Sequence, residues 1–112
     1  MDENANLQSK DLSGDTTALY ICLMNSDRRS DLDVRMNRLL KEIESRGWHA
    51  VRTITERVDG PDSPRPRLLS LLSDPSIGKI VVECQEQISK EGYPFIEAAL
   101  QAQGRSIVLM GS

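Results

Sequence analysis

Short apolar runs alternate with amphipathic segments along this chain from about residue 17 onward. The apolar runs are rich in β-branched residues and predict strands, at about 17–24, 48–55, 78–83 and 106–110. The segments between them repeat apolar residues at helical spacing and predict helices, at about 31–46, 66–72 and 94–103, the last of them ended by Gly104. This alternation predicts an α/β fold, with a parallel sheet of about four strands and helices on both faces.

The segment from Asp31 to Arg46 has the most regular helical pattern. Ser30 and Asp33 predict its start, and Gly47 predicts its end. Its apolar positions predict an inward stripe of Leu32, Met36, Leu39, Leu40 and Ile43. Its charged positions predict a solvated face of Arg35, Arg38, Lys41, Glu42, Glu44 and Arg46.

The loops that follow the first three strands are the expected place for a site. The segment 59–66 contains three prolines, which remove amide donors and exclude a central strand or a helix interior. In a parallel sheet the carboxyl ends of the strands share one edge, where sites form. We therefore expect residues 22–30, 57–67 and 83–92 to converge there.

The length and composition indicate one folded domain. A chain of 112 residues with 38% hydrophobic and 4% aromatic residues can bury one largely aliphatic core. Residues 1–16 are polar and predict a disordered leader, which leaves 17–112 as the domain. The longest apolar runs are too short to cross a membrane, and the N-terminus does not resemble a signal peptide. We therefore expect a cytoplasmic protein without a membrane contact.

The charge distribution argues against strong binding of DNA by the domain alone. The formal net charge is −3, and the excess lies in residues 1–16, which carry four carboxylates against Lys10. Residues 17–112 carry no net charge, so their composition does not indicate a basic face that would bind the phosphates of DNA. We expect DNA to be bound only weakly or through a partner.

Cysteine and histidine usage predicts neither a disulfide scaffold nor a metal site. Cys22 and Cys84 are two cysteines without metal-ligand spacing, and His49 is the one histidine. The expectation is two reduced, buried thiols and no cofactor. Trp48 and His49 are expected to cover the edge of the sheet.

Four segments carry a resemblance to a known family. Tyr20–Met24 matches a strand of the form Tyr-x-Arg-x-Ser, and Asp31–Leu39 matches a helix of the form Asp-Leu-x-x-Gln-x-x-x-Leu. Arg65–Leu72 matches a basic residue before Leu-x-x-Leu-Leu, and Ile80–Gly92 matches Ile-Val-Val-Glu followed by Asp-Arg-Leu-x-Arg-x-Gly. Together with the last helix and strand, these segments resemble the catalytic domain of the small serine recombinases (resolvases and invertases), especially the transposase-associated subgroup. The resemblance implies a flavodoxin-like, resolvase-type sheet and cutting of DNA through a phosphoserine. The DNA-binding module of that family has no counterpart within residues 1–112.

The catalytic positions that the resemblance implies are replaced. The nucleophilic serine falls on Met24, the first-strand arginine on Cys22, the Asp-Arg pair on Glu86 and Gln87, and the later arginine on Lys90. A thioether has no proton to lose and cannot form a stable phosphoester. The resemblance therefore implies a catalytically inactive domain for oligomerisation or regulation, as a homodimer or with a recombinase relative. A remnant anion site would use Arg65, Arg67 and Lys90.

Three other readings stay open. An active recombinase could use a displaced nucleophile, with Ser26, Ser30 and Ser89 as candidates. The segment Cys22–Arg28 resembles the phosphate loop of low-molecular-weight protein tyrosine phosphatases, in which Cys22 would attack phosphorus while Ser26 and Arg28 line the loop. A receiver-like domain would use Asp27 as phosphoacceptor. In the resembled fold the first and third strands are neighbours, so a redox link between Cys22 and Cys84 is a further hypothesis.

Overall fold

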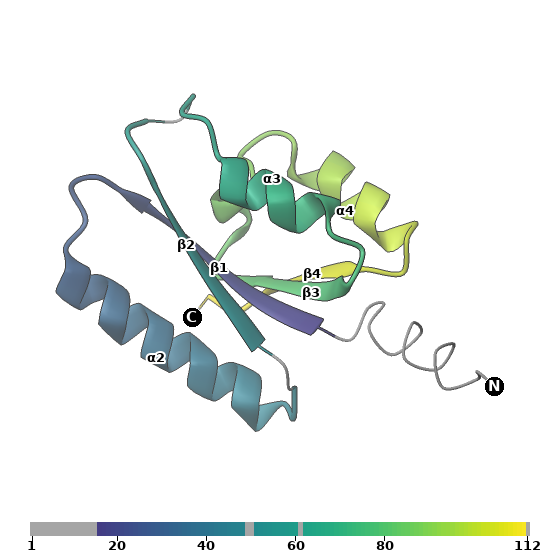
Figure 1. Cartoon of the computed structure of the whole chain (residues 1–112), viewed down its shortest axis with the longest axis horizontal. Coiled ribbons are helices and arrows are strands. Elements are labelled where there is room, and N and C mark those ends of the chain that lie inside the picture. The colour runs from purple at the N-terminus through teal and green to yellow at the C-terminus, as the bar shows by residue number, and fades with distance from the viewer. Residues whose placement is uncertain (1–15, 49–50, 61, 112) are drawn as a thin grey trace.

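The computed structural model describes residues 16–48, 51–60 and 62–111, which form alternating strands and helices (Figure 1). The strands are β1 (Thr16–Met24), β2 (Val51–Val58), β3 (Ile77–Val82) and β4 (Ser106–Leu109). The helices are α2 (Arg29–Ser45), α3 (Pro66–Ser73) and α4 (Tyr93–Gln101), with a short 3-10 helix η1 (Gln85–Gln87). No helix among these residues is both long and apolar enough to cross a bilayer.

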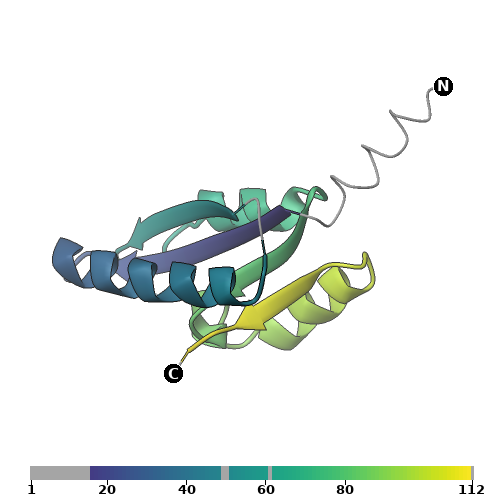
Figure 2. The same ribbon diagram turned by 90° about the horizontal axis from the view of Figure 1, so that it is seen from below.

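All four strands are parallel, in the order β2-β1-β3-β4. β1 pairs with β2 along its length, from Thr17 opposite Val51 to Met24 opposite Val58. Its pairing with β3 stops at Leu19, opposite Val81. Helix α2 covers one face of the sheet, and α3 and α4 cover the other (Figures 1 and 2). The predicted fold class is confirmed.

Two core clusters fill the two sides of the sheet. Alternate residues of β1 point to opposite faces, as the pleat of a strand requires. On the α2 side, Leu19, Ile21 and Leu23 pack with Leu39 and Ile43. The rest of the predicted stripe, Leu32, Met36 and Leu40, packs against this cluster. On the other side, the core joins β1 and β3 to α3 and α4 through Ala18, Tyr20, Ile80, Leu68, Leu71 and Leu100.

Several predicted boundaries shift. β1 begins at Thr16, inside the predicted leader, and the rest of that leader lies outside the described residues. β2 begins at Val51 and continues to Val58, whereas it was expected at 48–55. Trp48 instead packs against the core on the α2 side, with the charged groups of Arg46 and Lys79 over its ring at 5.4 and 5.2 Å. His49 lies outside the described residues.

The start signal for α2 was wrong and the end signals were correct. The helix begins at Arg29, because the Arg28 carbonyl already accepts a hydrogen bond from Leu32 N–H at 3.2 Å, so Ser30 lies within the first turn. Gly47 after α2 and Gly104 after α4 have φ of 77° and 75°. This left-handed conformation ends helices and favours glycine.

Candidate functional site at the carboxyl edge of the sheet

The three predicted loops converge at the carboxyl ends of the strands. Asn25 N–H donates to the Val58 carbonyl at 3.1 Å, and the side chain of Asn25 contacts Asp59, which joins the first two loops. Arg65 and Cys22 both contact Gln87, which joins the third loop to the others. The convergence that a parallel sheet implied is confirmed.

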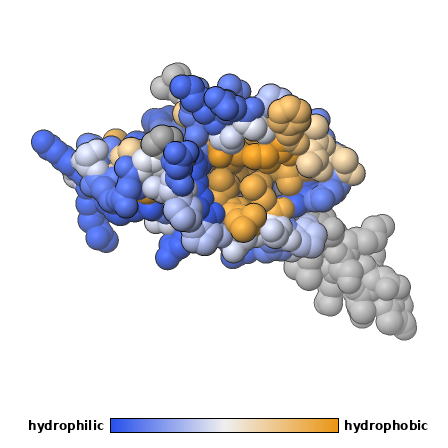
Figure 3. Space-filling view, turned by 90° about the horizontal axis from the view of Figure 1, so that it is seen from above, coloured by the Kyte–Doolittle hydropathy of each residue, from blue (hydrophilic) through white to orange (hydrophobic). Residues whose placement is uncertain are grey.

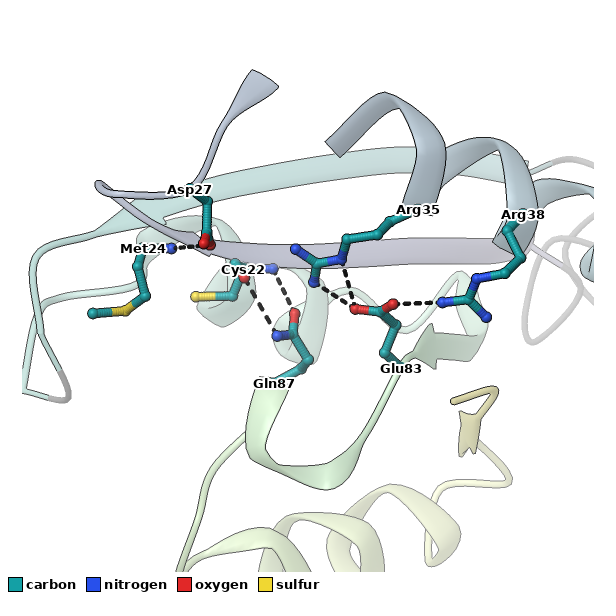
Figure 4. Close-up of polar contacts among 7 residues, drawn as sticks. All are labelled: Cys22, Met24, Asp27, Arg35, Arg38, Glu83 and Gln87. Atoms are coloured by element: carbon teal, nitrogen blue, oxygen red, sulfur yellow. Dashed lines mark hydrogen bonds and ion pairs between the residues drawn. The ribbon is translucent and has the colours of Figure 1, made fainter. Parts of the chain in front are cut away.

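Met24 is the last residue of β1, so it lies at this edge of the sheet, and it is 43% exposed. Its N–H donates to Asp27 Oδ2 at 2.9 Å, and Asp27 N–H returns a hydrogen bond to the Met24 carbonyl at 3.0 Å (Figure 4). The turn therefore satisfies its polar groups internally and presents the thioether to solvent.

Gln87 holds the main chain of Cys22 with both ends of its side-chain amide. Cys22 N–H donates to Gln87 Oε1 at 2.6 Å, and Gln87 Nε2 donates to the Cys22 carbonyl at 3.3 Å (Figure 4). Since β3 pairs with β1 only as far as Leu19, this amide takes the place of a strand beside Cys22. Two of the positions implied to be vacated are thus paired with each other.

The two cysteines differ in their surroundings. Cys22 is half-buried and packs against the core on the α3 and α4 side, as expected of a small core residue. Cys84 was expected to be buried but is exposed, because β3 ends at Val82 and the chain turns outward into η1. Partial desolvation is the main cause that raises the pKa of the Cys84 thiol, and a hydrogen bond with Glu86 adds to it. A redox link between the two thiols stays a prediction, which thiol titration of the denatured protein with and without reductant checks.

The two arginines of the proposed anion remnant are engaged by main-chain carbonyls. Arg65 Nη1 donates to the carbonyls of Gln87 and Ile88, the latter at 3.2 Å. Arg67 Nη1 donates to the Thr55 carbonyl at 3.0 Å. Glu86, within η1, and Lys90, after η1, are both exposed. Arg65 and Arg67 therefore use guanidinium donors to fix main chain.

The loop that resembles a phosphate loop is closed on itself. A phosphate cradle needs main-chain N–H groups that point at the ligand. Here four of them already have protein acceptors, namely those of Cys22, Met24, Asn25 and Asp27. The Asp27 carboxylate also occupies the inside of the turn, and Ser26 and Arg28 are exposed.

The candidate displaced nucleophiles do not share one place. Ser30 is exposed in the first turn of α2. Ser89 Oγ accepts a hydrogen bond from Gly92 N–H at 2.8 Å, before α4. Ser26 stays close to the end of β1 and is exposed. Among the residues the structure describes, no group of three or more His, Cys, Asp or Glu side chains could hold a metal ion.

Comparison with known proteins assigns the family. No model of a known protein family matches the chain. The crystal structure of the C-terminal catalytic domain of IS1535 TnpA, an IS607-like serine recombinase, is 39% identical to it with a TM-score of 0.74. The match covers 85% of this chain and 70% of that one. This chain belongs to the IS607-like serine recombinase family.

Other known proteins are similar to the chain at lower identity. The C-terminal catalytic domain of ISC1926 TnpA has the same fold, with a TM-score of 0.74 and 20% identity. The match covers 87% of the present chain and 68% of the ISC1926 TnpA chain. Uncharacterized proteins of Mycobacterium tuberculosis and Mycobacterium bovis are 26% identical over 96 residues, which is 86% of this chain. The chain spans 32% of the length of these curated relatives.

A clamp between α2 and β3 in this recombinase domain was not predicted. Arg35 Nε donates to Glu83 Oε1 at 2.9 Å, and Arg38 Nη2 donates to Glu83 Oε2 at 2.6 Å (Figure 4). The hydrogen bond with Glu83 raises the pKa of Arg35. The expectation of a solvated face was therefore wrong for Arg35, which is half-buried, whereas Arg38 is exposed as expected although it also pairs with Glu83. Their i, i+3 spacing was a signal for a shared partner, but its identity required the packing of α2 on the sheet.

A buried carboxylate beside the site was also missed. Glu56 on β2 is 7% exposed and accepts hydrogen bonds from Tyr20 Oη at 2.8 Å and from the N–H groups of Arg67 and Leu68 at 2.7 and 3.1 Å. It therefore supplies the acceptor that the N-terminus of α3 lacks from its own N-cap residue, Arg65. Burial, together with the hydrogen bond to Glu56, raises the pKa of Tyr20 well above its usual value.

Proposed function

We propose that this recombinase domain does not cleave DNA and acts through protein contacts, as an oligomerisation or regulatory domain. The observation that carries the proposal is the exposed thioether of Met24 at the carboxyl end of β1, where the family resemblance places the nucleophilic serine. A thioether forms no stable ester with phosphorus.

The surroundings of Met24 support the same conclusion. Phosphoryl transfer needs guanidinium groups that clamp the charge on the equatorial oxygens. Positions Cys22 and Gln87 carry no charge, and the Gln87 amide is engaged by the Cys22 main chain. Each missing contact of this kind costs about 3 kcal/mol of transition-state stabilisation. Loss of the nucleophile and of these charges together leaves no effective route to strand cleavage.

The surface on the α3 and α4 side supports a role in protein contacts. Apolar side chains gather on this side of the molecule (Figure 3). Leu69 of α3 is 65% exposed and Phe95 of α4 is 78% exposed, next to the half-buried Leu72 and Ile96. We call these four residues the α3–α4 patch. Exposed apolar surface of this kind marks interaction sites in soluble proteins, and we propose that it meets a second copy or a recombinase relative.

DNA cleavage is tested directly with supercoiled plasmid. The purified chain and its Met24→Ser variant are incubated with plasmid beside an active serine recombinase as positive control, and nicking and covalent protein–DNA adducts are measured. We expect neither product from either protein, because the serine alone does not restore the missing guanidiniums. A covalent adduct formed by the unmodified chain would overturn the proposal. Loss of that adduct in Ser26→Ala, Ser30→Ala or Ser89→Ala would then identify a displaced nucleophile.

A regulatory role is tested by mixing. Adding the chain to a full-length recombinase relative is expected to change the recombination rate of the relative, and light scattering is expected to detect a complex of the two proteins.

The phosphatase hypothesis is tested with a small aryl phosphate as substrate. Release of phosphate by the natural protein that is lost in Cys22→Ser would favour this hypothesis.

A further inference from the structure

A groove on the outer side of β2 concentrates positive charge. It has a volume of about 520 Å³ and lies where the first turns of α2 and α3 approach the carboxyl end of β2. Arg29, Arg57 and Arg67 line it, one from each of these elements. β2 is an edge strand, and the lining of the groove includes Leu23 of β1 but neither Cys22 nor Gln87.

The positive charge of the groove is only partly compensated. Glu56 is the one carboxylate in its lining, and its oxygens already accept hydrogen bonds from Tyr20 and from the start of α3. Within residues 16–48, 51–60 and 62–111, the ion pairs of the structure involve other arginines, namely Arg35, Arg38, Arg46 and Arg52. Three guanidiniums against one engaged carboxylate leave the groove electropositive, although the chain as a whole is acidic.

The guanidiniums of the groove retain donors for a ligand. Arg67 uses Nη1 on the Thr55 carbonyl. Arg57 makes only long contacts, at 3.4 and 3.5 Å, to the carbonyls of Met24 and Asp27. A guanidinium has five N–H donors in a planar fork that matches the oxygens of a phosphate group. Arg57 and Arg67 therefore each line the groove with donors that these contacts leave unused, and Arg29 is an exposed third residue of the lining.

Apart from Thr55, the rest of the lining is apolar. Leu32, Pro64 and Pro66 supply its accessible part, since Leu23 is only 1% exposed. Small-molecule sites combine apolar walls with a few polar groups and have volumes of about 300–1,000 Å³. We propose that this groove binds a small phosphate-bearing ligand with an apolar or ring portion, of the nucleoside diphosphate class. The guanidiniums hold the phosphates, and the side chains of Leu32, Pro64 and Pro66 contact the ring.

Calorimetric titration with ADP, pyrophosphate and adenosine, at a physiological salt concentration, tests the proposal. We expect ADP to bind more tightly than either fragment, because it uses both the charged and the apolar parts of the groove. Arg57→Gln and Arg29→Gln are expected to weaken binding of ADP about tenfold or more. Arg28→Gln is the matched control: it removes the same charge one residue before Arg29, from an exposed position outside the lining, and is expected to change affinity less than about twofold.

The outcomes separate the proposal from its competitors. Absence of ADP binding by the folded chain overturns it. Equal weakening by Arg28→Gln and Arg57→Gln shows general attraction of anions and also overturns it. A single-stranded oligonucleotide that displaces ADP with the same dependence on Arg57 would make nucleic acid the occupant. Far-ultraviolet circular dichroism of each variant confirms that a loss of binding is not a loss of folding.

Discussion

At the scale of single residues, the buried charges of this domain stabilise helix ends. Glu56 accepts hydrogen bonds at the start of α3, and Arg105 donates at its end, to the carbonyls of Leu71 and Leu72 at 2.8 and 2.9 Å. Arg105 is 4% exposed and also donates to the Ile77 carbonyl at 2.8 Å. An acidic group at the start and a basic group at the end both match the helix dipole. A helix of eight residues is thus held at both ends by side chains from other elements.

Removal of the Arg105 guanidinium is expected to destabilise the domain. Arg105→Met keeps the apolar stem but removes the guanidinium donor from three carbonyls, of which that of Leu71 retains another donor, Asp74 N–H, and we expect a loss of about 3 kcal/mol of unfolding free energy. Urea denaturation measures the loss. Arg52→Met is the control, since its contact with Asp74 is exposed and should contribute less than about 1 kcal/mol. Similar losses in both variants would contradict the capping role.

Tyr20 gives the stability a dependence on alkaline pH. Because burial and Glu56 raise its pKa above the usual value of 10.0, the folded state keeps this proton where the unfolded state releases it. The resulting stabilisation is fully present below about pH 10 and is lost progressively as pH rises further. Unfolding free energies measured between about pH 9 and pH 11 should fall more steeply in the natural protein than in Tyr20→Phe. Parallel curves for the two proteins would exclude this origin.

At the scale of elements, η1 completes the sheet that β3 leaves unfinished. β3 turns away after Val82, and the side-chain amide of Gln87 pairs with Cys22 in its place. The apolar runs predicted the strands, because burial on both faces imposes that pattern. η1 buries no residue of its own, so hydrophobic periodicity could not reveal it. Its residues became informative only through contacts across 65 positions of sequence.

Replacement of Gln87 is expected to open the end of β1 locally. Gln87→Leu leaves the N–H and carbonyl of Cys22 without this partner, and exchange of the Cys22 amide hydrogen should accelerate about tenfold or more. Hydrogen exchange followed by NMR measures the effect. Gln85→Leu, at an exposed position of the same short helix, should leave that exchange unchanged. An unchanged exchange rate of the Cys22 amide in Gln87→Leu would show that the Gln87 side chain does not hold the end of β1.

At the scale of the whole molecule, the two faces of the sheet are covered differently. α2 is largely charged and is tied, through Arg35 and Arg38, to Glu83 directly after β3. α3 and α4 expose apolar side chains instead, including Leu69 and Phe95 (Figure 3). This asymmetry is the reason for proposing the α3–α4 patch, and not α2, as the surface for association.

Phe95→Asp is expected to abolish or strongly weaken association of the chain with itself or with a relative, because it places a charge in a desolvated contact. Light scattering over a concentration series measures the mass. Val34→Asp is a matched control, since Val34 is 68% exposed but lies on α2, across the sheet. Association lost equally in Val34→Asp, or retained in Phe95→Asp, would assign the contact to another surface.

The sequence by itself determined the alternation of strands and helices, the inward stripe of α2, the helix ends at Gly47 and Gly104, and the meeting of three loops at one edge. These follow from local spacing and from the geometry of parallel sheets, so neighbouring residues suffice to predict them. Only the tertiary structure decided which polar groups are buried and what they contact: Arg105 at the end of α3, Glu56 at its start, Gln87 beside Cys22, and Glu83 between Arg35 and Arg38. Each of these contacts joins residues 11 to 65 positions apart. A buried hydrogen bond depends on the three-dimensional position of both partners, and no pattern along the chain encodes that position.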